Sequence, residues 1–310
     1  MRRTPAAPWK RSSTYWGWDS EPVVHCEHYL TATSLEEAIG LLREHAGRSR
    51  VVAGGTDLVL ELGRGKQDAV TLVDLTGIAS LRYIREVDGV LHVGALSTHQ
   101  DLVSSPLLRA KAAALALAAA AVGSPQIRRV GTVGGNLVNA RPAADTAIAL
   151  LALGARVRVF GDCGEREMGM IDLYAGVGRC TLDADAEILT EVLFPIPSGS
   201  GFQRLARRKA LALPIINAAA AFTLDADGAC RNAGVAVGPM APVPWRSREA
   251  EAVLRGRPVD ADAIEAAAEA AMSEVTCRDS IRACAEYRRP MVGVLVKRAL
   301  LQAAGHVLHD

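Results

Sequence analysis

Two glycine-rich stretches decide how this chain folds, and the longer one reads Gly-Thr-Val-Gly-Gly-Asn-Leu-Val-Asn-Ala-Arg-Pro-Ala-Ala-Asp over residues 131–145. The shorter one reads Ala-Gly-Gly-Thr-Asp-Leu over residues 53–58. Glycine has no Cβ, so backbone N–H groups can converge at such turns and a ligand can approach the main chain. Each stretch also begins a helical segment, where unpaired N–H groups favour an anion. Together they predict a site that holds a phosphate-bearing ligand from both sides.

Neither stretch matches a common phosphate-binding signature. The G-x-G-x-x-G pattern of dinucleotide-binding folds and the G-K-[ST] ending of a P-loop are both missing. Either Gly-Gly pair taken alone is as well explained by a tight turn without a ligand. The pair of stretches is more informative because polar side chains accompany the glycines, and hydroxyl, amide and carboxylate groups suit the ribose and phosphate of a nucleotide. These side chains are Thr56, Thr132, Asn136, Asn139 and Asp145.

The sequence around the first stretch predicts a β-α-β-like unit. Ser34 to Glu37 forms a capping box before apolar residues at helical spacing. In this unit a strand at 51–52 runs into the glycine turn and a short helix, and a second strand follows at 70–75. In the middle of the chain, strands are expected at 81–85 and 90–95, joined by a turn at Asp88-Gly89. Helices are then expected at 106–122 and 146–153, followed by strands at 155–160 and 188–194.

The last third of the chain has a different pattern. Strands at 215–224 and 233–237 precede helices at 247–254, 260–273 and 285–303, an order typical of an α+β domain. The Pro/Gly/Ser-rich stretch 195–201 is the best candidate for a boundary. We therefore expect an extension at 1–25, a domain of two α/β subdomains at 26–197, and a second domain at 201–310.

Composition narrows the class of protein. The 310 residues include 35 basic and 34 acidic ones, so the net charge of +1 gives no field to attract nucleic acid or an anionic membrane. The 6 cysteines show no C-x-x-C or metal-ligand spacing, which predicts reduced thiols in a cytoplasmic protein. We expect no transmembrane segment. The extension at 1–25 contains Trp9, Trp16 and Trp18 and is either a flexible arm or a docking segment for another subunit.

Together the two stretches resemble those of a known family. Residues 53–58 and 131–145, with Ala-Glu-Tyr-Arg-Arg at 285–289, look like the FAD-binding subunit of the xanthine dehydrogenase and carbon monoxide dehydrogenase group of molybdenum hydroxylases. The similarity runs from about residue 25 to 305. It implies an α+β fold, with an FAD-binding domain of the vanillyl-alcohol-oxidase type followed by a smaller α+β domain.

The resemblance also implies a cofactor site. Residues 53–58 would wrap the FAD pyrophosphate, the turn at 132–136 would bind the flavin nucleotide, and Asp145 would contact the adenosine portion. Leu189 would contact the ring system, and Arg204 stands where the family often has lysine. The implied set contains no catalytic residue and no metal ligand and comprises Ala53, Gly54, Gly55, Thr56, Asp57, Leu58, Thr132, Val133, Gly134, Gly135, Asn136, Asp145, Leu189 and Arg204.

For the function, the resemblance implies an oxidoreductase subunit that transfers electrons. A large molybdopterin-binding subunit would oxidise the substrate, a small subunit would carry [2Fe–2S] clusters, and FAD here would pass electrons to NAD⁺, a quinone or another acceptor. A dimer of heterotrimers is expected. Two alternatives stay open: a self-sufficient flavin reductase or oxidase of the same fold, such as a relative of UDP-N-acetylenolpyruvoylglucosamine reductase, and a module that has lost FAD. The proton-donor motif of the first is not found, and the intact glycine stretches oppose the second.

Four further residues have simpler interpretations. We expect His99 to be a capping or surface histidine and Asp74 to end a strand or turn. Tyr174 is placed either in packing or beside the flavin, and Cys180 is expected away from the flavin.

Overall fold

The structure is a computed structural model that describes residues 26–64, 71–208 and 210–307. The tryptophan-rich extension at 1–25 lies outside the described residues. Within those ranges, no helix combines the length and the apolar character that crossing a membrane requires. The 6 cysteines all lie in the described part and are all free thiols.

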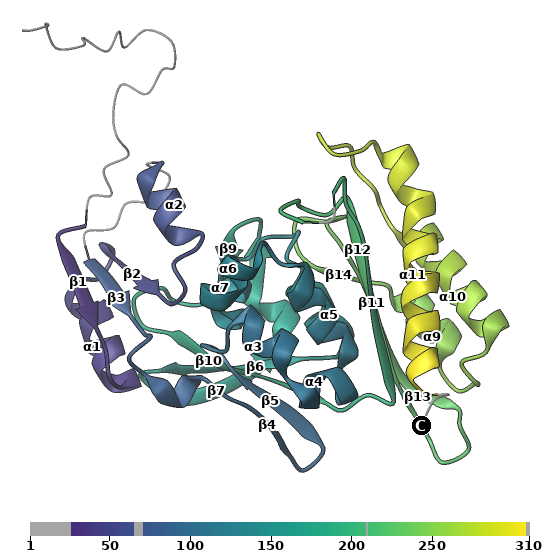
Figure 1. The fold of residues 1–310 in the computed structure, drawn as a ribbon, viewed down its shortest axis with the longest axis horizontal. Helices are drawn as coiled ribbons and strands as arrows, with labels where there is room; N and C mark the ends of the chain where they lie inside the picture. Colours follow the sequence, from purple (N-terminus) through teal and green to yellow (C-terminus); the bar gives the residue numbers. More distant parts are fainter. Residues whose placement is uncertain (1–25, 65–70, 209, 308–310) are drawn as a thin grey trace, which may run out of the picture.

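The N-terminal part is a small parallel sheet with one covering helix (Figure 1). Strands β1 (His28–Thr31), β3 (Thr71–Asp74) and β2 (Ser49–Val52) lie in that order, and helix α1 (Leu35–Glu44) connects β1 to β2. The Ser34 hydroxyl accepts from the Glu37 N–H and begins α1 as predicted, but the Glu37 carboxylate binds Thr33 instead of Ser34. The predicted helix is therefore present with only half of its capping box. The predicted β-α-β-like unit is observed as β2, the short helix α2 (Leu58–Gly63) and the parallel strand β3.

The middle of the chain forms an antiparallel sheet covered by helices. Its order is β4 (Ile84–Val87), β5 (Val90–Gly94), β10 (Ile188–Pro195), β6 (Arg156–Gly161) and β7 (Gly164–Gly169). The turn at Asp88-Gly89 has the positive φ values that a tight hairpin needs, so that prediction is confirmed. The remaining elements are η1 (Ala79–Leu81), α3 (His99–Ser104), α6 (Pro125–Val130), α7 (Val133–Val138), α8 (Asp145–Ala152), η2 (Met170–Leu173), β8 (Tyr174–Gly176) and β9 (Arg179–Cys180).

One predicted helix is divided in two. The expected helix at 106–122 is observed as α4 (Pro106–Lys111) and α5 (Ala113–Ala121), with Ala112 in a non-helical conformation between them. The Ala114 N–H donates to the Ser200 hydroxyl at 3.2 Å, so the start of α5 is bound to the next part of the chain. The prediction of one continuous helix was wrong because this tertiary contact outweighs alanine's local helix propensity.

The last part is a sheet with helices on both faces. Strands β11 (Gly199–Leu205), β12 (Ile216–Leu224), β13 (Cys230–Gly238) and β14 (Trp245–Arg246) are antiparallel and lie in that order. Helices α9 (Arg248–Leu254), α10 (Ala261–Glu274) and α11 (Ala285–Val307) follow, and α11 packs against β11 and β12 (Figure 1). Helices α5 and α8 of the preceding part pack against the other side. Small residues permit this: a Cβ on Gly234 would lie 2.0 Å from the Ala152 carbonyl oxygen.

Candidate cofactor site

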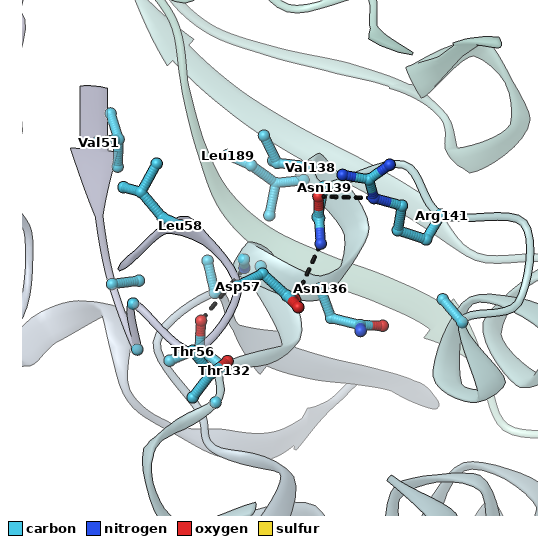
Figure 2. Close-up of a pocket in the computed structure, with 18 of the residues that line it drawn as sticks. Val51, Thr56, Asp57, Leu58, Thr132, Asn136, Val138, Asn139, Arg141 and Leu189 are labelled. Atoms are coloured by element: carbon cyan, nitrogen blue, oxygen red, sulfur yellow. Dashed lines mark hydrogen bonds between the residues drawn. The ribbon is translucent and has the colours of Figure 1, made fainter. Parts of the chain in front are cut away.

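A cavity of about 790 Å³ lies where the three parts meet. Its wall combines the end of β2 and α2 (Leu58–Gly63), the α6–α7 region, strand β10 and the loop after β11 (Figure 2). Cofactor pockets in proteins are typically about 300–1,000 Å³. The cavity is therefore large enough for a nucleotide-sized cofactor.

The first glycine segment enters this wall directly from β2. Val52 ends the strand, and the chain then turns at Gly54 and Gly55 into α2. A Cβ on Gly54 would lie 2.2 Å from the Val130 carbonyl oxygen, and Gly55 has a φ of +64°. Any side chain at Gly54 would collide with backbone, and a side chain at Gly55 would be strained. Close backbone approach therefore requires glycine at position 54, and the left-handed backbone conformation favours glycine at position 55.

The second glycine segment meets the first at this point. A Cβ on Gly131 would lie 3.5 Å from the Thr56 Oγ1, and a Cβ on Gly134 would lie 2.7 Å from the Ala95 Cβ. Thr132 begins α7, with its hydroxyl accepting from the Gly135 N–H at 3.2 Å. The two segments, distant in the sequence, form one continuous backbone surface on the cavity wall.

A buried polar group closes one end of the cavity. Asp145, at the start of α8, is 5% exposed and accepts from Arg204 Nε and Asn217 Nδ2 at 3.1 and 2.7 Å. Burial raises the pKa of the Asp145 carboxyl to about 6, and Arg204 and Asn217 oppose a further rise. Arg204 also donates to the Ala212 carbonyl oxygen. Asp145 thus ties α8 to strands β11 and β12.

The structure brings almost all of the expected site residues together. Apart from Val133, every residue of the set implied by the sequence lines the cavity, including Leu189 on β10 and Arg204 on β11. Val133 does not: its side chain is fully buried in the core beneath α7. Arg204 and Asp145, expected as separate contacts, are paired with each other.

The expectation that His99 is a capping or surface histidine was wrong, because Thr98 caps α3 and His99 is buried. The residue is the first of α3 and directly follows Thr98, which forms a capping box with Asp101. Its side chain lines the cavity and is 2% exposed. Its Nδ1 has no hydrogen-bond partner among the described residues. Burial, with a smaller effect of the Arg128 charge, lowers the pKa of His99 to about 4. The imidazole is therefore neutral at pH 7, and the polar pattern Ser-Thr-His-Gln-Asp gave no signal of this burial.

The other three single-residue expectations have mixed outcomes. Cys180 lies on β9, which pairs with β8, and lines the cavity; its expected place away from the flavin stays a prediction. Tyr174 is buried and packs with the core. Asp74 ends β3 as expected and accepts from the Tyr29 hydroxyl at 2.8 Å.

Comparisons with known proteins identify the class. A family described as the FAD binding domain in molybdopterin dehydrogenase matches residues 24–197, and the CO dehydrogenase flavoprotein C-terminal domain matches residues 202–303. The carbon monoxide dehydrogenase structure from Hydrogenophaga pseudoflava superimposes with a TM-score of 0.83 and 28% identity, over 91% of this chain and 98% of that chain. The fold and the site thus define an FAD-binding flavoprotein of the dehydrogenase type.

Relatives in sequence define the family more closely. The nicotinate dehydrogenase FAD-subunit of Eubacterium barkeri is 37% identical over 77% of this chain and 82% of its own length. The carbon monoxide dehydrogenase medium chain of Afipia carboxidovorans is 30% identical over 89% of this chain and 96% of its own length. This chain belongs to the family of FAD-binding subunits of xanthine dehydrogenase and carbon monoxide dehydrogenase type molybdenum hydroxylases.

The cavity wall fits FAD in its chemistry. Glycines leave the backbone of both segments accessible, and hydroxyl and amide groups from Thr56, Thr132 and Asn136 line the same wall. The apolar side chains of Leu58 and Leu189 also line the cavity, as Figure 2 shows. A nucleotide with a polar phosphate bridge and an apolar aromatic ring needs this combination.

Proposed function

We propose that this chain is the electron-transfer subunit of a molybdenum hydroxylase complex. It receives electrons from [2Fe–2S] clusters of a small partner subunit and passes them from FAD to NAD⁺, a quinone or another acceptor. The contact of the two glycine segments in the wall of one cofactor-sized cavity carries this proposal. The family match and relatives named as medium or FAD subunits support it.

The residues divide into distinct roles in this proposal. Residues 53–58 wrap the pyrophosphate, and Thr132, Gly134, Gly135 and Asn136 bind the flavin nucleotide. Asp145 contacts the adenosine portion, and Leu189 packs on the flavin ring. Arg204 keeps a positive charge in the cavity wall beside Asp145. All of these residues line the cavity, which supports the assignment.

The chain itself needs no acid–base catalysis for this role. Bound FAD supplies the redox chemistry, and the protein binds it, orients it and sets its electrostatic surroundings. The neutral His99 ring adds a polar group to the wall without adding charge. Asn136 is held in place by the Thr146 hydroxyl, which donates to its Oδ1 at 2.7 Å.

The assembly follows from the same role. We propose that a large molybdopterin-binding subunit and a small [2Fe–2S] subunit accompany this chain in a cytoplasmic dimer of heterotrimers. The free thiols of this chain support a reducing compartment. We further propose a division into residues 26–197 and 201–310, which agrees with the separate spans of the two family matches.

Rapid-mixing reduction of the flavin tests the electron route. The FAD-loaded chain is mixed with its pre-reduced small [2Fe–2S] partner, and the visible flavin absorption is followed. We expect fast bleaching with the reduced partner and none with the oxidised partner. A flavin that stays oxidised beside a bound, reduced partner would contradict the proposal. Rapid turnover of a substrate by the isolated chain would instead favour the self-sufficient reductase or oxidase.

A further inference from the structure

The short helix α2 lines one side of the cavity, and within the described part of the chain its apolar packing is on the parallel sheet. Leu62 is buried and Leu58 packs beside it against the parallel sheet, whereas Val59 and Leu60 are 49% and 55% exposed. The helix has six residues and follows the glycine turn at Gly55, whose φ of +64° is a conformation that glycine adopts freely. Packing alone therefore fixes α2 weakly.

Polar side chains on another face of α2 contact the chain that follows α7. Asp57 and Glu61 lie one turn apart, and the Glu61 N–H donates to the Asp57 carbonyl oxygen at 3.0 Å, so both side chains lie on one face. Asn139 Nδ2 donates to Asp57 Oδ2 at 2.9 Å. The Arg141 guanidinium donates to the Glu61 carboxylate. All four residues line the cavity, so these contacts join α2 to the chain after α7 along its wall.

A third contact links the Asn139–Asp57 hydrogen bond to the Arg141–Glu61 ion pair. Arg141 Nε donates to Asn139 Oδ1 at 3.2 Å, so the Asn139 amide has a partner at each end, as Figure 2 shows. Asn139 is therefore oriented toward α2 and Arg141, although its position in the sequence had grouped it with residues for the ribose or phosphate. Its place in the structure is that of a bridge between the two glycine segments.

We propose that Asp57, Glu61, Asn139 and Arg141 form a latch that holds α2 closed over the bound FAD and sets the rate at which the cofactor leaves. The inference rests on the proposed assignment of residues 53–58 to the FAD pyrophosphate. In this proposal the latch contacts break and the chain rotates near Gly55 when FAD leaves, while Leu58 and Leu62 are the apolar contacts of α2 with the sheet. Closing restores the contacts without changing the glycine backbone.

FAD release from the full chain tests the latch. Holo-protein is diluted far below saturation, and the rise of flavin fluorescence gives the release rate. We expect Glu61→Gln and Arg141→Gln each to speed release about two- to five-fold, the range for a partly exposed ion pair. The exchange E61R/R141E restores the pair and should bring release back toward the wild-type rate. Added salt should speed release in the wild type but not in R141Q.

A matched control separates the latch from general charge effects. Arg129 on α6 is an exposed arginine near the cavity but outside the latch, so Arg129→Gln should leave FAD release unchanged. Equal release rates for wild type, E61Q, R141Q and R129Q would overturn the proposal. So would a reciprocal exchange that releases FAD as fast as the single variants.

A second measurement does not depend on the cofactor. In the FAD-free chain, amide hydrogen exchange over residues 58–63 should be faster in R141Q than in wild type or R129Q, because the latch then no longer holds α2. Unchanged exchange would contradict the latch even if the wild type bound no FAD. Failure of the wild type to bind FAD would contradict the proposed function instead, so the two failures are distinguishable.

Discussion

At the scale of single residues, the cavity wall depends on glycines at which a Cβ atom would overlap a neighbouring segment. Gly54 and Gly134 press against the backbone of residues 130 and 95, so their requirement for glycine comes from contact between segments that are distant in the sequence. The sequence could predict that glycine mattered there, but not which atoms it met. Val133 shows what a motif cannot predict. It lies inside the second glycine stretch, yet its side chain is buried in the core and does not line the cavity.

Gly54→Ala tests this packing. Its Cβ would overlap the Val130 carbonyl oxygen, so the two glycine segments must separate and FAD binding should fall at least tenfold. The control is Gly40→Ala, where a Cβ meets nothing within 4 Å inside α1 and should stabilise the fold by about 0.5–1 kcal/mol. Titration with FAD and urea unfolding measure both. Normal FAD affinity in Gly54→Ala would show that the segments need not touch.

His99 gives a pH dependence with a definite sign. Its pKa is about 4 in the fold against an ordinary 6.5, so the unfolded chain binds more protons between these values. Stability from this residue is complete above pH 6.5 and is lost as the pH falls toward 4, by about 3 kcal/mol in total. Asp145, with a pKa raised to about 6, has the opposite slope.

The difference between wild type and His99→Gln isolates the histidine, because Asp145 is common to both. Urea unfolding of the FAD-free proteins at several pH values should show wild type losing stability relative to His99→Gln as the solution is acidified from pH 6.5. Parallel stability curves for the two proteins across this range would refute a buried neutral histidine.

At the scale of elements, periodicity and turn chemistry predicted most helices and strands, including the hairpin at Asp88-Gly89 and the long C-terminal helix. The failure at 106–122 arises from a contact between parts. The helix expected there breaks at Ala112, and Ser200 on β11 binds the start of α5. No local pattern encodes a bond between residues so far apart.

Ser200→Ala tests that bond. It leaves the buried N–H of Ala114 without its partner and should lower the free energy of unfolding by about 1–3 kcal/mol. Ser80→Ala, at an exposed position, should change it by less than about 0.5 kcal/mol. Urea unfolding measures both, and equal values for the two variants would contradict the role given to Ser200.

At the scale of the whole molecule, the site is assembled where the parts meet. Asp145 from α8 binds Arg204 from β11 and Asn217 from β12, so the same contact closes the cavity and joins the last sheet to the preceding part. The resemblance named both Asp145 and Arg204 as cofactor contacts but gave no indication that they pair. Pairing depends on the fold as a whole, which a motif does not describe.

A double-mutant cycle measures this coupling. Asp145→Asn, Arg204→Gln and the double variant should give an interaction free energy of about 1–3 kcal/mol, because both side chains are largely buried. The exposed pair Lys297–Glu265 is the control and should give about 0–1 kcal/mol. An interaction free energy for Asp145–Arg204 no larger than that of the control pair would mean that Asp145 and Arg204 do not join the two parts of the chain.

FAD binding by this cavity is tested most directly by an FAD titration of the purified chain, read by its visible absorption spectrum and by the amount of FAD retained after gel filtration. We expect flavin bands at one FAD for each chain in the wild type, and loss of those bands in folded Gly54→Ala. A folded wild-type chain that retains no flavin after saturation with FAD would contradict the assignment of this cavity to FAD.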